Sequence, residues 1–162
     1  MRRLRLAGGE LLLNGTGVRA VAWFKGYAAG LYLPRRSSEL EQVLAMPGPK
    51  RVQLRMLQAV PAEELVNALR KGLARNTPDP ARLAERTETL ARAMLDAGAV
   101  KKGDVIDLDQ DPTRGTLFAL NGTLRGDPIV GDDFYAALLG SFVGRRPYDK
   151  RLKAGLLGLP AS

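Results

Sequence analysis

The chain of 162 residues is 45% hydrophobic and 26% charged, with a net charge of +8 and a pI near 10.2, as expected of a basic globular protein. It contains no histidine and no cysteine, which excludes Ser-His-Asp and Cys-His catalysis and zinc sites built on imidazole or thiolate. No apolar stretch approaches the ~20 residues of a membrane span, and the basic residues are too dispersed to favour nucleic acid as a partner.

The N-terminus, MRRLRLAGGE, begins like the basic head of a signal peptide, but no apolar segment follows it. The protein is therefore expected to be cytoplasmic, or periplasmic or secreted if a leader has been removed. Residues 4–6 alternate between leucine and arginine and predict a strand. Asn14-Gly15 then predicts a tight turn, and the apolar pattern up to Leu33 predicts two extended segments hinged near Gly26.

Arg19 stands at the head of this apolar stretch. A permanently charged guanidinium at the point where a strand enters the core is costly unless it meets an anion or a polarised oxygen. Alternatively, Arg19 caps the sheet edge and points to water. Tyr27 and Tyr32 fall on opposite faces of the predicted strand, so one of them points into the core, where its hydroxyl needs a partner.

The middle of the chain predicts three helices and one strand. The helices are expected over residues 38–45, from Pro61 to about 76, and from about 80 to 97, with a strand over 52–56 that has one wet face. On the second helix, Glu64 and Lys71 share a face beside the leucine stripe. Their side chains either reach a cavity or are exposed to solvent at the border of the buried stripe.

The last third predicts strands and a closing helix. Asn121-Gly122 is the clearest hairpin signal, between 116–120 and Leu124. The acidic run at 107, 109 and 111 resembles the start of a calcium loop, but proline stands where the loop requires glycine, so no metal site is expected. A helix is predicted from Asp132 to Pro147; within it, Ser141 is expected to bond its own i−4 carbonyl.

The order of these elements favours an α+β fold, an antiparallel sheet covered by helices. There are no repeats, linkers or low-complexity tracts, so residues 1–162 are expected to form one domain. Neither G-x-G-x-x-G after a strand nor a Walker loop occurs, and no cofactor is expected.

Four segments together resemble the bacterial branch of the chalcone isomerase-like proteins: NGTGVRAVAWFKGYAAGLYLP, VPAEELVNALRKGLARN, KKGDVIDLDQDPTRGTLFALNG and FYAALLGSFVGRRPYDKRLKAGLLG. The similarity extends over about Leu11 to Gly158, with the motifs in the family's order. It implies an open-faced β-sandwich, a large antiparallel sheet layered with helices and a ligand cleft between the layers.

The resemblance also implies a reaction that can be compared with this chain. Plant chalcone isomerases close a chalcone into a flavanone by attack of a phenolate on an enone. Their key arginine, in a G-x-G-x-R context, polarises the carbonyl as the enolate forms, and it falls on Arg19. The threonine of the late helix falls on Ser141. Tyr27 replaces a threonine, and Glu64 and Lys71 replace the tyrosine and asparagine of the cleft.

Three functions follow from the resemblance. The favoured one is a non-catalytic protein that binds a small amphipathic, fatty-acid-like carboxylate, because family relatives hold such a carboxylate with an arginine and a tyrosine. The alternatives are a chalcone isomerase-type intramolecular lyase with Arg19 as electrophile, and a structural or interaction protein whose Arg19 is neutralised by an acid such as Glu64. The expected ligand-binding residues are Arg19, Tyr27, Glu64, Lys71 and Ser141.

Overall fold

The computed structural model describes residues 3–21 and 24–160. Its centre is a seven-stranded sheet in which neighbouring strands are antiparallel and follow one another in chain order. The strands are β1 (Arg3–Leu6), β2 (Gly9–Val21), β3 (Phe24–Leu33), β4 (Lys50–Met56), β5 (Val105–Asp111), β6 (Gly115–Leu120) and β7 (Thr123–Ile129). The helices are α1 (Leu40–Ala45), α2 (Ala62–Arg75), α3 (Pro80–Ala97), α4 (Asp132–Val143) and α5 (Lys150–Leu156).

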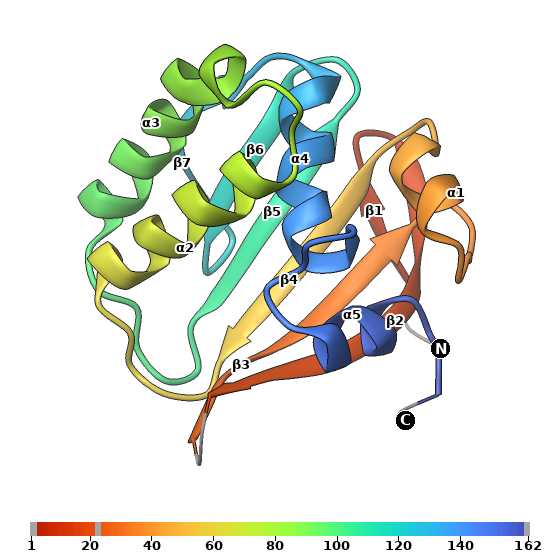
Figure 1. Ribbon diagram of the computed structural model, residues 1–162, viewed down its shortest axis with the longest axis horizontal. Coiled ribbons are helices and arrows are strands. Elements are labelled where there is room, and N and C mark those ends of the chain that lie inside the picture. Colours follow the sequence, from red (N-terminus) through yellow and green to blue (C-terminus); the bar gives the residue numbers. More distant parts are fainter. Residues whose placement is uncertain (1–2, 22–23, 161–162) are drawn as a thin grey trace.

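The helices gather over one face of the curled sheet, with α2, α3 and α4 over its second half and α5 along β2 (Figure 1). The alternation of β4 places Val52, Leu54 and Met56 in the core below these helices. The solvent-facing side predicted for this strand is the opposite one. The predicted α+β architecture, an antiparallel sheet layered with helices, is confirmed.

The two Asn-Gly pairs have different structures. Asn121 and Gly122 have φ angles of 52° and 84° and connect β6 to β7, which confirms the predicted hairpin. Asn14 and Gly15 instead lie inside β2, at an irregularity in its pairing with β3. The predicted turn there is wrong, and so is the hinge near Gly26, which lies inside β3.

Long-range hydrogen bonds explain why Asn14 does not form a turn. Its side-chain amide donates to the carbonyl oxygens of Ser37 (2.9 Å) and Leu156 (2.8 Å), and its oxygen accepts from the Ser37 amide (2.8 Å). These bonds tie β2 to the segment before α1 and to α5.

The chain reverses between Val21 and Phe24, and residues 22–23 of that connection lie outside the described part.

The acidic run of β5 pairs across the outer face of the sheet. Asp109 accepts a bidentate pair of bonds from Arg51 (2.7 and 2.8 Å), and Asp107 accepts from Gln53 (2.9 Å).

Over residues 3–21 and 24–160, no cluster of His, Cys, Asp or Glu side chains is arranged to hold a metal ion. In the same part of the chain, no helix has the length and apolar character of a membrane span.

The closing helix α4 is shorter than predicted, because it ends at Val143 rather than near Pro147. A Cβ at Gly144 would lie 2.8 Å from the side-chain oxygen of Asn76, so the end of α4 packs tightly against the end of α2. The amide of Asn76 also donates to the carbonyl of Arg146 (3.0 Å). The 144–149 segment therefore leaves α4 and crosses toward the sheet before α5 begins.

Candidate functional site

The glycines of the G-x-G-x-R motif allow α5 to pack directly on β2. A Cβ at Gly15 would lie 2.1 Å from the carbonyl oxygen of Gly155, and a Cβ at Gly155 would lie 2.2 Å from the carbonyl oxygen of Thr16. Backbone therefore meets backbone at this contact, which only glycine permits. The contact fixes α5, and with it the 144–149 segment, beside the end of β2 that carries Arg19.

Arg19 lies on the helix-facing side of the sheet, because it pairs directly with the inward-facing Tyr27 of β3. Its Nη1 donates to the carbonyl oxygen of Tyr148 (2.8 Å), and its guanidinium carbon lies 5.7 Å from the centre of the Tyr148 ring. Within the described residues, no carboxylate forms an ion pair with Arg19. The arginine thus meets a polarised oxygen and an aromatic face.

Tyr148 joins the 144–149 segment to two helices and fills the space beside Arg19. Its hydroxyl donates to the carbonyl oxygen of Ala68 in α2 (2.8 Å). Its ring meets Phe142 of α4 edge-on, with the centroids 5.2 Å apart and the planes at 82°. Burial raises the pKa of Tyr148 to about 12, so its phenol is protonated and acts as a donor at neutral pH.

Tyr148 is not among the residues predicted from the sequence. The one signal is its position in the Arg-Arg-Pro-Tyr-Asp stretch, an aromatic side chain between Pro147 and Asp149 in a connection that is otherwise polar. A large aromatic in such a connection usually packs under it, but its target among the helices and strands depends on the fold.

Tyr27 is buried, with 9% of its surface exposed. Burial raises the pKa of its phenol well above the ordinary value, Tyr148 raises it further, and the charge of Arg19 opposes both. The phenol is therefore neutral and can donate a hydrogen bond. Tyr32 points to the other face of the sheet, as expected from its spacing of five residues.

Ser141 is fully buried in α4, and its hydroxyl donates to the carbonyl oxygen of Ala137 (3.2 Å), which confirms the predicted i−4 bond. The serine lies against α2 at Gly72. A Cβ at Gly72 would come within 2.4 Å of the Ser141 Oγ and 2.5 Å of the Tyr148 hydroxyl oxygen. Gly72 therefore makes room for both hydroxyls between α2 and α4.

The structure brings Arg19, Tyr27 and Ser141 together around Tyr148, but not the two predicted residues of α2. Glu64 and Lys71 are exposed, and the α2 residues that meet Tyr148 are Ala68 and Gly72. Glu64 forms no ion pair with Arg19 within the described residues.

A curled antiparallel sheet with helices over one face is the architecture of the chalcone isomerase fold. The chain belongs to the chalcone isomerase-like family, which it matches over residues 1–158. Among solved structures it is similar to a fatty-acid binding protein of Arabidopsis thaliana, with a TM-score of 0.76 and 14% identity over 96% of each chain. No curated protein matches it.

Proposed function

We propose that this protein is a non-catalytic binder of a small amphipathic carboxylate, with Arg19 and Tyr27 holding the head group. The observation that carries the proposal is a partly buried guanidinium that has no acidic partner among the described residues and lies opposite a neutral, buried phenol. A guanidinium can bind a carboxylate through two parallel N–H···O bonds, and a phenol can donate a third.

The surroundings suit the hydrocarbon part of such a ligand. Ala29 and Leu31 continue the inward face of β3 beyond Tyr27, and Phe142 of α4 packs against Tyr148; all three belong to the apolar core. The Arabidopsis protein of the same fold is a fatty-acid binding protein, which supports this class of ligand. Apolar side chains with a few convergent polar groups are the usual lining of a small-molecule site.

Tyr148 has to move when the ligand binds, because its ring and carbonyl oxygen occupy the approach to Arg19. A carboxylate would replace that carbonyl oxygen as the acceptor on Arg19. The exchange favours the ligand because a hydrogen bond between two charged groups is stronger than one to a neutral carbonyl. The contacts of Tyr148 with Ala68 and Phe142 are the ones that this movement breaks.

A binding role is favoured over isomerisation because Glu64 and Lys71, at the positions that the resemblance gives to a catalytic tyrosine and asparagine, are exposed. Arg19 alone supplies only part of the transition-state stabilisation. We expect the absorbance of a chalcone mixed with the protein to change no faster than in its spontaneous cyclisation. A faster change that Arg19→Met abolishes would assign the lyase function instead.

Calorimetric titration with dodecanoate tests the binding proposal. The wild-type protein is expected to bind, and Arg19→Met to bind about 10- to 100-fold more weakly, since a hydrogen-bonded charge pair contributes about 1.5–3 kcal/mol. Arg5→Met is the matched control, because Arg5 is exposed in β1, away from Arg19. The affinity of this variant for dodecanoate should equal that of the wild type. Equal affinity in all three proteins, or no binding to wild type, would show that Arg19 only holds Tyr148 in place.

A further inference from the structure

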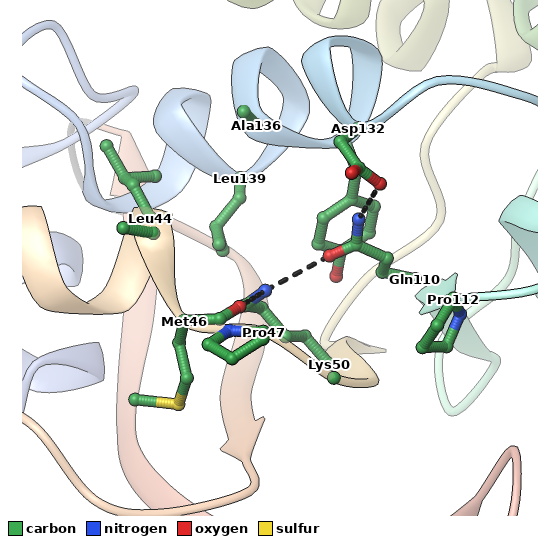
Figure 2. Close-up of a pocket in the computed structure, with 12 residues that line it drawn as sticks. Leu44, Met46, Pro47, Lys50, Gln110, Pro112, Asp132, Ala136 and Leu139 are labelled. Carbon is green, nitrogen blue, oxygen red and sulfur yellow. Dashed lines mark hydrogen bonds between the residues drawn. The ribbon is translucent and has the colours of Figure 1, made fainter.

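A buried lysine lies at the other end of β4 from the Arg19 site. Lys50 is the first residue of the strand and only 3% exposed. Its Nζ donates to the carbonyl oxygen of Met46 and to Oε1 of Gln110 (3.1 Å). Figure 2 shows these bonds, with the lysine reaching from the sheet toward α4.

Lys50 lines a pocket of about 400 Å³ between the 44–48 segment and the first turns of α4. The pocket is partly apolar, with walls formed by Leu44, Pro47, Pro112, Ala136 and Leu139. Figure 2 shows Leu139 and Ala136 on the α4 side and Pro47 on the opposite side of the Lys50 amine.

The charge of Lys50 is poorly matched in the described part of the chain. Both of its acceptors are neutral, and no carboxylate there forms an ion pair with it. Asp132, which also lines the pocket, is linked to Lys50 only through Gln110, since its carboxylate accepts from the other end of that side chain (3.1 Å). A buried cation without a directly bound anion is unfavourable, and an ammonium has one more N–H to donate. Burial accordingly lowers the pKa of Lys50, and the negative charge of Asp132 opposes this shift.

We infer that this pocket is a second ligand site, which binds a small organic carboxylate through the ammonium of Lys50. A single ammonium matches the charge of one carboxylate, and the apolar walls match a short hydrocarbon chain. The site is separate from the proposed one at Arg19. Lys50 is six residues along β4 from Met56, the partner of Tyr27, a separation of about 20 Å in an extended strand.

A purely structural role for Lys50 makes a different prediction. Met46 is the C-cap of α1, so its carbonyl is one of those left without a partner inside the helix. A lysine that only capped the end of α1 would contribute to the stability of the fold, and the pocket would then show no preference for carboxylates.

Amide and side-chain NMR titration with hexanoate tests the inference, with hexanamide as the neutral isostere. Hexanoate is expected to shift the signals of Gln110, Ala136 and Leu139, and hexanamide to shift them at least tenfold more weakly. Lys50→Met should weaken the hexanoate effect at these signals by tenfold or more. Arg19→Met should leave it unchanged, which separates this site from the proposed function.

A second variant keeps the test valid if Lys50→Met fails to fold. Ala136 is exposed at the pocket wall, so Ala136→Trp should block the pocket while leaving Lys50 in place and abolish the hexanoate shifts. Ala81→Trp, exposed on α3, is the control that should keep them. Equal responses to hexanoate and hexanamide, or full hexanoate binding in Ala136→Trp, would overturn the inference. Loss of stability in Lys50→Met with unchanged hexanoate shifts would assign Lys50 the structural role alone.

Discussion

The hydroxyl of Thr116 is buried in β6 and has no hydrogen-bond partner in the described part of the chain. A buried hydroxyl that has lost its water without gaining a partner destabilises the folded state. Thr116→Val keeps the shape of the side chain and removes this cost, so we expect the free energy of unfolding to rise by about 1 kcal/mol. Urea denaturation followed by circular dichroism measures the change.

Tyr135→Phe serves as the contrasting variant. The Tyr135 hydroxyl is fully buried but donates to the carbonyl oxygen of Leu108 (2.8 Å). Its removal should lower the free energy of unfolding by about 1–3 kcal/mol, because the carbonyl loses a partner. A decrease in stability for Thr116→Val as well would mean that its hydroxyl is satisfied in solution.

The site residues differ in how far the sequence predicts them. Arg19 stands out by its chemistry alone, because a charge at the entrance to a core strand needs a partner wherever the strand lies. The position of Tyr148 beside it depends on a connection whose path is set by α5 and the end of α4. Helical spacing and the resemblance both select Glu64 and Lys71, but spacing defines only a shared face of α2 and not the direction in which that face points.

At the scale of elements, the packing of α5 on β2 depends on glycines. We predict that Gly155→Ala lowers the free energy of unfolding by about 2–3 kcal/mol, because its Cβ would lie 2.2 Å from the Thr16 carbonyl oxygen and must push the two backbones apart. Chemical denaturation measures this loss. Arg151→Ala is the control, since Arg151 is an exposed residue of the same helix. Equal stabilities of the two variants would show that α5 shifts along β2 without cost.

The two Asn-Gly pairs show why element boundaries are only partly predictable. Both have the same local preference for positive φ, and at Asn121 the side-chain bonds to Val105 (2.8 Å) and Asp104 (3.2 Å) are compatible with the hairpin turn. At Asn14 the side chain instead gains bonds to Ser37 and Leu156, which are distant in the sequence. The strands and helices follow from hydrophobic periodicity, whereas this exception depends on contacts that only the folded chain creates.

At the scale of the whole molecule, acid should weaken the contact between α3 and the start of α4. Arg86 makes bonds of 2.7 and 2.9 Å to Asp133 and lowers the pKa of that carboxyl to about 2. The unfolded-state value is near 3.8, so the stabilisation is complete above about pH 4 and is lost as the pH falls toward 2. The pair is partly exposed, so we expect a loss below about 1 kcal/mol.

Denaturation midpoints measured from pH 6 to pH 2 test this dependence. Asp133→Asn should make the profile flatter between pH 4 and 2, whereas Glu41→Gln should not, because the Glu41–Arg145 pair is highly exposed. Identical acid profiles for wild type and Asp133→Asn would contradict the prediction.

The contact between Arg19 and Tyr148, which closes the Arg19 site, links an early strand to a late connection of the chain. β2 supplies the guanidinium, and the 144–149 segment supplies Tyr148. If a carboxylate binds only when this closure opens, its apparent affinity is reduced by the small open fraction. Tyr148→Phe removes the bond to Ala68 and leaves the ring, which should cost about 1 kcal/mol of closed-state stability. We therefore expect dodecanoate to bind Tyr148→Phe up to about fivefold more tightly than wild type, while the melting temperature of the free variant falls. Calorimetric titration and thermal denaturation of the same samples measure both quantities. Weaker binding in Tyr148→Phe would mean that the phenol contacts the ligand rather than competing with it.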